Sequence, residues 1–273
     1  MGTRDPHRFS NELDDVMIRR LVDRLESRGK DAVFTRLFDK YATKLELPKS
    51  ARVLEVGCGT GVVIRALARR TDFYGTAVGI DQSPVFIDAA RRLAEEEGVN
   101  KQVEFHVGDA HELEYTEGIF DAVIAHTLIS HVTDPSAVLN EAARLVQSTG
   151  KVVIFDGDYG SLTFAFRDRD FGRQIDHALA LTTFNNPLIM RDLPRLLPQM
   201  GFEITETMTD VVAEIGSGSY FKTFAETYAP LVSSGGLLSP KRVDDWLAEQ
   251  QRAIEQGTFF ASCNYYAYLA KRT

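Results

Sequence analysis

The residues best suited to chemistry are concentrated at positions 53–61, which read Val-Leu-Glu-Val-Gly-Cys-Gly-Thr-Gly. The apolar start of this stretch suits a buried strand, and residues 62–70 after it suit a short helix. Glycine adopts positive φ and has no side chain, so a ligand can lie directly on the backbone of such a turn. The N-terminus of the following helix presents free N–H groups to an anionic group. The stretch therefore predicts a cofactor-binding turn.

The spacing of the three glycines distinguishes two classes of cofactor. A dinucleotide site reads G-x-G-x-x-G, whereas this chain reads G-x-G-x-G with an acidic residue two positions before the first glycine. This version resembles motif I of the class I S-adenosylmethionine (SAM) methyltransferases, in which the acidic residue helps to hold the amino-acid end of the cofactor. The alternative is a tight turn without a ligand. The resemblance implies SAM contacts for Glu55, Gly57, Cys58, Gly59, Thr60 and Gly61.

A second acidic residue follows about 20 positions later. Residues 76–81 form an apolar strand that ends in Asp81. An ionised Asp only accepts hydrogen bonds, so its two oxygens suit the two hydroxyls of a ribose. The neighbouring Gln82 and Ser83 belong to the same predicted site, and Ser83-Pro84 also predicts the start of a helix. A ribose contact does not distinguish SAM from NAD, because both cofactors carry a ribose. The alternative is that Asp81 caps the following helix.

A third strand, predicted over residues 103–107, runs into Gly108-Asp109-Ala110. This tripeptide resembles the methyltransferase motif in which an acid accepts a hydrogen bond from the adenine amino group and the next backbone N–H binds the ring. Asp109 and Ala110 occupy those two positions. Gly-Asp is also a common turn sequence, so it is weak evidence alone. It supports a cofactor site because it follows the glycine turn and the strand that ends in Asp81.

Two residues at later strand ends are candidates for catalysis. His126 ends the strand predicted over residues 120–125, next to the expected methyl group, and imidazole titrates near neutrality. Asp156 ends the strand predicted over residues 151–156 and is a second candidate base. His126 is also a cofactor contact in this interpretation, and packing against the cofactor is the alternative to a role as base. No metal site is predicted, because no tight ligand motif is present.

These residues need a fold that brings strand ends together. Strands and helices alternate over residues 51–156, which predicts a parallel sheet with right-handed crossovers. The fold class is therefore α/β. The resemblance implies a Rossmann-like, seven-stranded, mostly parallel sheet whose last strand is antiparallel. It also implies a helical lid over residues 1–48 and a SAM-binding domain over residues 49–273. Helical insertions at 157–200 and 216–257 are expected to form a substrate cap.

Composition limits the partners. The chain has 273 residues, 44% of them hydrophobic, and a formal net charge of -8. Proteins that neutralise phosphates are usually basic, so nucleic acid is not an expected partner. The two cysteines form no C-x-x-C pattern, and the N-terminus has no apolar leader. We expect a cytoplasmic protein without a membrane insertion, and the sequence leaves a homodimer open.

The motifs together predict a SAM-dependent methyltransferase that moves a methyl group to an O, N or C atom of a small, partly apolar metabolite. The resemblance is greatest to the small-molecule group that includes the ubiquinone and menaquinone biosynthesis methyltransferases. The alternatives are a SAM-fold protein with a non-methylating role and an NAD-dependent oxidoreductase. The cofactor motifs would look the same in the first alternative, and the glycine spacing argues against the second.

Overall fold

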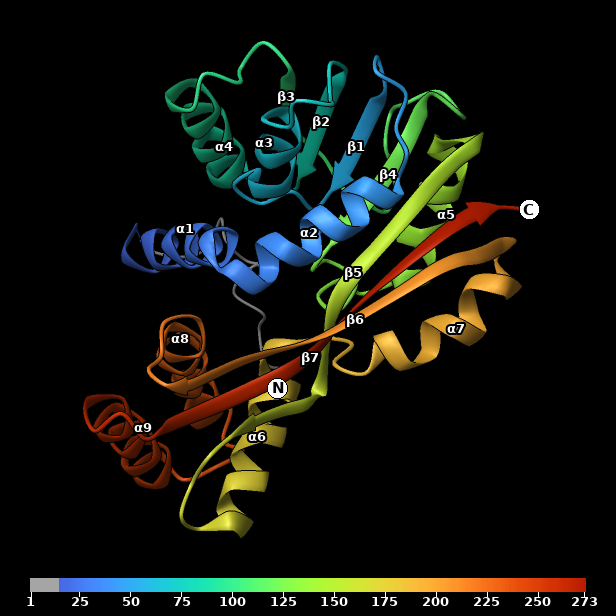
Figure 1. Ribbon diagram of the computed structural model, residues 1–273. Coiled ribbons are helices and arrows are strands. Elements are labelled where there is room, and N and C mark those ends of the chain that lie inside the picture. Colours follow the sequence, from blue (N-terminus) through green and yellow to red (C-terminus); the bar gives the residue numbers. More distant parts are fainter. Residues whose placement is uncertain (1–14) are drawn as a thin grey trace.

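The computed structural model describes residues 15–273, so the first 14 residues of the helical lid expected over residues 1–48 lie outside it. Seven strands form one sheet (Figure 1): β1 (Arg52–Val56), β2 (Thr76–Asp81), β3 (Val103–Val107), β4 (Phe120–His126), β5 (Val146–Phe164), β6 (Phe202–Gly216) and β7 (Phe259–Arg272). The described helices are α1 (Asp15–Lys30), α2 (Ala32–Lys44), α3 (Val62–Ala68), α4 (Pro84–Glu96), α5 (Pro135–Leu145), α6 (Arg169–Thr183), α7 (Ile189–Gln199), α8 (Tyr220–Ser234) and α9 (Pro240–Glu255).

The strand order confirms the predicted fold class. It is β3-β2-β1-β4-β5-β7-β6, with parallel pairing from β3 to β5 and with β7 antiparallel to both β5 and β6. The chain order reverses between β1 and β4, whose carboxyl ends therefore lie side by side without a helix crossing over them. In an open α/β sheet this is where a ligand binds.

Both faces of the sheet are covered, as expected for parallel strands that are apolar throughout. Adjacent residues alternate between two cores, so Val53 belongs to one hydrophobic cluster and Leu54 to the other. Helices α3 and α4 cover the first face, while α5 and α7 cover the second (Figure 1). The helices thereby fix the positions of the strand ends.

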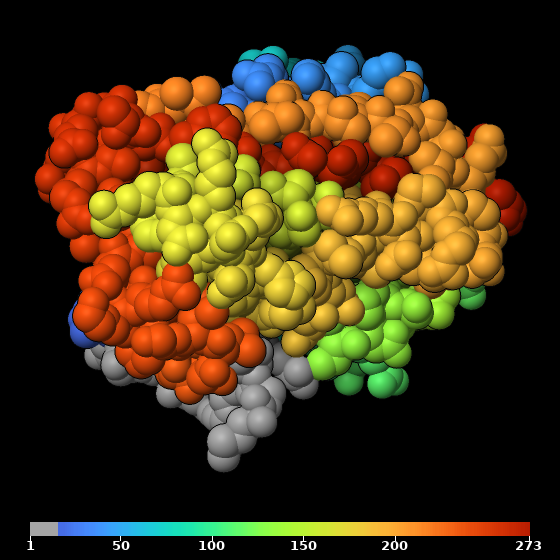
Figure 2. Space-filling model, turned by 90° about the horizontal axis from the view of Figure 1, so that it is seen from below, coloured from blue at the N-terminus to red at the C-terminus, as the bar shows by residue number. Residues whose placement is uncertain are grey.

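Strand β5 is longer than the sequence predicts. β5 begins at Val146 rather than after Gly150, and it continues to Phe164. Residues 157–164 are therefore strand, which corrects the expectation of a helical insertion from residue 157. The strand continues because β7 pairs with it as far as Phe164, opposite Ala261. Helices α6, α8 and α9 pack around this extension, and in the view from below their yellow to red segments form much of the surface (Figure 2).

Helices α1 and α2 lie across the sheet near the ends of the central strands (Figure 1). Asp31 caps α2 by accepting the backbone N–H groups of Val33 and Phe34. The far end of α2 is tied to β6 by the ion pair between Lys44 and Glu206, at 3.0 Å. None of the helices in residues 15–273 is long and apolar enough to cross a membrane.

Candidate active site

A cavity of about 430 Å³ opens at the carboxyl ends of β1, β2 and β4. Helices α1 and α2 close one side of it, and the loops after β3 and β4 close another. Most of the predicted site residues line this cavity. They are Glu55, Gly57, Cys58, Gly59, Thr60, Asp81, Gln82, Asp109, Ala110 and His126.

Two residues predicted to contact the cofactor, Gly61 and Ser83, do not line this cavity. Gly61 does not line the cavity; it precedes α3 with φ of 75°, and a Cβ there would lie 2.5 Å from the ring of Phe105. Because Gly61 has no side chain, the start of α3 can pack closely against Phe105 of β3. Ser83 is fully buried, and its hydroxyl accepts the backbone N–H of Phe86 at 3.3 Å. It caps α4, so the capping prediction for Ser83 is confirmed while the structure does not bring it to the cavity.

Asp81 connects the glycine turn to the end of β2. One carboxylate oxygen accepts the backbone N–H of Gly59 at 2.8 Å, and the other accepts that of Ser83 at 2.9 Å. Burial raises the pKa of Asp81, while these two hydrogen bonds act against that rise. Each oxygen keeps lone-pair capacity for a further donor. Asp81 can therefore hold the turn and still accept hydrogen bonds from a diol in the cavity.

Glu55 and Arg28 face the same cavity without an ion pair between them. Glu55 is only 2% exposed, and its Oε2 has no hydrogen-bond partner among the described residues. Burial raises the pKa of Glu55 well above its ordinary value, although the positive charge of Arg28 on α1 opposes this rise. The Arg28 guanidinium lines the cavity and forms no ion pair within residues 15–273. A carboxyl oxygen without a partner in residues 15–273 and a guanidinium in the same cavity fit a zwitterion, such as the amino-acid end of SAM.

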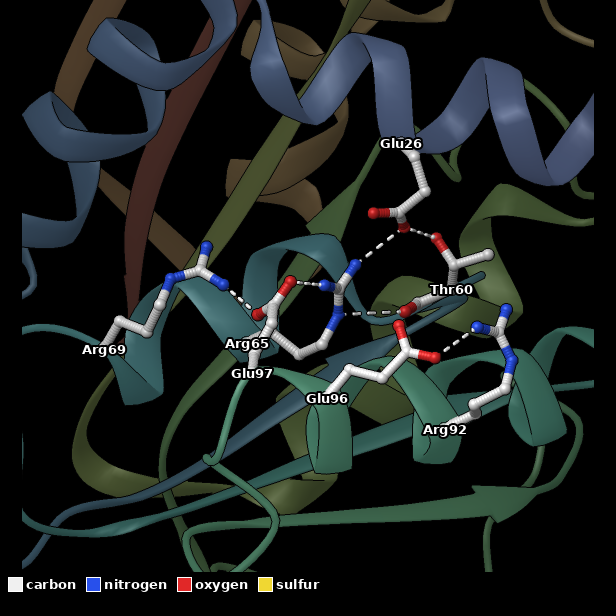
Figure 3. A network of polar contacts seen from close by, with 7 residues as sticks. All are labelled: Glu26, Thr60, Arg65, Arg69, Arg92, Glu96 and Glu97. Atoms are coloured by element: carbon white, nitrogen blue, oxygen red, sulfur yellow. Dashed lines mark hydrogen bonds and ion pairs between the residues drawn. The ribbon is translucent and has the colours of Figure 1, made fainter.

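A polar network joins α1 to the glycine turn (Figure 3). Oε1 of Glu26 accepts hydrogen bonds from the Thr60 hydroxyl and from Arg65, both at 2.6 Å. The Arg65 side chain is 2% exposed; it also donates to the Thr60 carbonyl at 3.3 Å and pairs with Glu97. Glu97 pairs in turn with Arg69. The position of the cofactor turn is thus linked to that of the helix above it.

The end of the cavity expected for adenine is formed after β3. The Asp109 carboxyl is 65% exposed and accepts the backbone N–H of His111 at 2.9 Å. Nδ1 of His111 lies 2.6 Å from the same oxygen. Ala110 lines the cavity beside them, and Gln82 lies exposed at its rim. Asp109 and Ala110 therefore lie together at the end of the cavity that is formed after β3.

The two predicted catalytic residues lie in different environments. His126 is 7% exposed, lines the cavity and has its pKa lowered, first by burial and then by Arg28. Asp156 is fully buried and does not line the cavity. Its carboxylate accepts the backbone N–H groups of Ser130 and Gly157 and the hydroxyl of Tyr159. These bonds join the loop after β4 to the middle of β5, so Asp156 holds this loop in place and does not face the cavity.

The regions expected to form the substrate cap, residues 157–200 and 216–257, do not line the cavity. Every residue that lines the cavity lies between Leu25 and Thr133. The helices of the 157–200 and 216–257 regions pack instead around the extended β5 and β7, behind the aromatic side chains that support His126. This difference arises because β5 continues past the cavity and carries the helices away with it. Within residues 15–273, no group of three or more His, Cys, Asp or Glu side chains could hold a metal ion.

Three residues of the site were not found from the sequence: Glu26, Arg28 and Tyr41. All three lie on α1 and α2, where the sequence shows only an amphipathic pattern. Such a pattern separates buried from exposed faces but does not distinguish a charged residue facing solvent from one facing a cavity.

Comparison with known proteins agrees with this geometry. Residues 47–219, more than half of the chain, match the model of a family described as the methyltransferase domain. The chain belongs to this methyltransferase family. The sequence-based assignment to the class I SAM methyltransferases is thereby confirmed, and SAM is the cofactor of the family.

The relatives of this methyltransferase domain have diverse acceptors. An uncharacterised protein of a Streptomyces fradiae transposon is 30% identical over 81% of this chain and 62% of its own length. The ubiquinone biosynthesis O-methyltransferase of Xanthomonas axonopodis is 35% identical over 42% of this chain and 46% of its own. Other relatives are named as N-methyltransferases. The chain spans less than two thirds of the length of the first of these curated relatives.

Solved structures confirm the fold. A protein of Bacillus halodurans C-125 that is named as a putative methyltransferase superposes with a TM-score of 0.62 at 20% identity. The match covers 86% of this chain and 97% of that one. At this level of identity the likeness concerns the fold alone, and the acceptor depends on the site itself.

Proposed function

We propose that this chain is a SAM-dependent methyltransferase that transfers a methyl group to an O, N or C atom of a small, partly apolar molecule. The observation that carries the proposal is the charge pattern of the cavity. Oε2 of Glu55 has no hydrogen-bond partner among the described residues, and it shares the cavity with Arg28, a glycine turn and an acid suited to a ribose. A dinucleotide offers no zwitterion to this pair, whereas the methionine end of SAM does.

The residues of the chain divide the binding task among them. Arg28 would hold the α-carboxylate and Glu55 the α-ammonium group, while Asp81 would accept the ribose hydroxyls. Asp109 and the backbone N–H of Ala110 would hold the adenine. When bound, SAM supplies an electrophilic methyl group on a sulfonium. Because the reaction is an in-line displacement, alignment of donor and acceptor and exclusion of water are the main contributions of the protein.

The helices α1 and α2 serve as the lid in this proposal. They contribute Leu25, Phe34 and Phe38 to the cavity wall, opposite the polar strand ends. Apolar side chains there favour an acceptor with an apolar part, since burying that part releases water from both surfaces. The lid also carries Arg28, so cofactor binding and lid position are linked.

Thermal unfolding with SAM, S-adenosylhomocysteine, NAD or buffer alone tests the proposal. A ligand at 100 times its dissociation constant stabilises by about 2.7 kcal/mol, which corresponds to a shift of several degrees for a chain of this size. We expect shifts with SAM and S-adenosylhomocysteine but not with NAD. Calorimetry should show SAM binding weakened about tenfold or more in Arg28→Met, because a charged hydrogen-bond pair is lost. A shift with NAD alone, or with none of the ligands, would contradict the proposal.

A further inference from the structure

His126 lies at the end of β4 with its ring held from two sides. Its Nδ1 lies 2.9 Å from the hydroxyl oxygen of Tyr41 on α2, and its ring stacks on Phe155 of β5 with 4.3 Å between centroids. The next residue, Thr127, has φ of 52°, a conformation that a β-branched residue adopts only under constraint. Since His126 lines the cavity, the ring edge that carries Nε2 is the one left for a bound molecule.

The contact with Tyr41 decides which nitrogen of His126 carries the proton. The Tyr41 side chain is fully buried, and within residues 15–273 the only hydrogen-bond partner of its hydroxyl is Nδ1 of His126. If Nδ1 were the donor, the hydroxyl proton would remain buried without an acceptor, which is unfavourable. Tyr41 therefore donates its proton, and Nδ1 accepts it.

The surrounding charges keep this imidazole neutral. Burial, followed by the positive charge of Arg28, lowers the pKa of His126. Burial, and after it the charge of Glu55, raises the pKa of Tyr41, so its hydroxyl stays protonated. A neutral imidazole has one N–H group, and Nδ1 is already an acceptor. The proton of His126 therefore lies on Nε2, at the edge of the ring that faces the cavity.

We propose that His126 donates a hydrogen bond from Nε2 to an oxygen of the methyl acceptor, and that Tyr41 is the positioning residue that fixes this tautomer. The inference rests on the proposed function, because it names the acceptor class for the same cavity. The acceptor carries an oxygen with a free lone pair at or beside the methylated atom, as in a phenolate, an enolate or a carboxylate. No proton is transferred at His126, so a hydroxyl acceptor enters as its oxyanion.

Nitrogen NMR of the protein labelled with ¹⁵N-histidine tests the tautomer without any ligand. The chain has six histidines, and the His126 signal is the one lost in His126→Gln. We expect the wild-type protein to show the Nε2–H tautomer throughout the neutral range. Tyr41→Phe should introduce the Nδ1–H tautomer, whereas Tyr74→Phe, at an exposed tyrosine, should leave the signal unchanged. A wild-type Nδ1–H tautomer, or an imidazolium at neutral pH, overturns the proposal even if SAM binds.

The acceptor class is tested with 4-nitrophenolate and its methyl ether, 4-nitroanisole, each in the presence of S-adenosylhomocysteine. We expect the wild-type protein to bind the phenolate at least tenfold more tightly than the ether. His126→Gln keeps an N–H donor and should keep this preference, whereas His126→Leu should lose it. A lack of preference in the wild-type protein, including failure to bind either compound, overturns the oxygen assignment. SAM affinity measured alongside distinguishes this result from failure of the proposed function.

Discussion

The wall of the cavity and the C-terminal half of the molecule both surround one sheet, but their buried side chains differ in kind. Along residues 25–133, buried or half-buried polar groups such as Glu55, Asp81 and His126 face the cavity. Along residues 146–272, the long strands and α6, α8 and α9 bury aliphatic side chains together with many aromatic ones, including Phe164 and Trp246. The first region offers polar groups that can bind a ligand, whereas the second forms a packed core that supports the cavity. Substitutions in the two regions should therefore affect different measurements.

The largest expected effect is on stability alone. Trp246 is fully buried on α9 and packs edge-on against Phe164 of β5, with ring centroids 5.1 Å apart. Trp246→Ala should lower the free energy of unfolding by about 3–5 kcal/mol, because it leaves a cavity in the core. Denaturant unfolding measures this change. Calorimetry below the transition should show SAM affinity near that of the wild type, and Trp246→Phe should lose much less stability. A parallel loss of SAM affinity would show that the two regions are not separable.

A buried acid in the C-terminal half gives the next effect, which depends on pH. Asp176 on α6 accepts the backbone N–H of Phe164 at 3.2 Å, and burial raises its pKa to about 7. Between pH 4 and 7 the unfolded chain has already ionised this carboxyl while the folded chain keeps it protonated, so Asp176 makes stability fall as pH rises.

Asp176→Asn removes this titration. The variant should exceed the wild type in stability by as much as about 4 kcal/mol at pH 8 and differ little near pH 4. Chemical unfolding at both pH values measures the difference, with SAM affinity unchanged. An equal effect at both values would assign the change to hydrogen bonding rather than to ionisation.

The smallest expected effect concerns the residue that joins the lid to the cofactor turn. Glu26→Gln weakens the hydrogen bonds to Thr60 and Arg65, so it should lower stability by about 1–3 kcal/mol and weaken SAM binding severalfold. The matched control is Glu96→Gln, whose exposed pair with Arg92 does not reach the turn (Figure 3). It should change either quantity by less than about 0.5 kcal/mol. Calorimetry and urea unfolding of both variants decide whether this link is specific.

The sequence by itself determined the parallel half of the fold and the cofactor turn. Strand and helix periods are local, and caps such as Ser83 before α4 follow from a few neighbouring residues. The order of the motifs then placed Glu55, Asp81 and Asp109 at the ends of consecutive strands, and the structure brings all three to one cavity. These positions follow from the chain's own connectivity, because parallel strands end at a common edge of the sheet.

Only the tertiary structure decided the partners of those residues. Tyr41 and His126 are 85 positions apart, and their hydrogen bond depends on how α2 packs across β4. Arg28 lies on a helix whose pattern fixes a buried face but not the side chain opposite it. The extension of β5 to Phe164, which carries the later helices away from the cavity, depends on pairing with β7 about 100 residues later. Contacts between distant segments depend on packing of the whole chain, and local sequence patterns do not encode them.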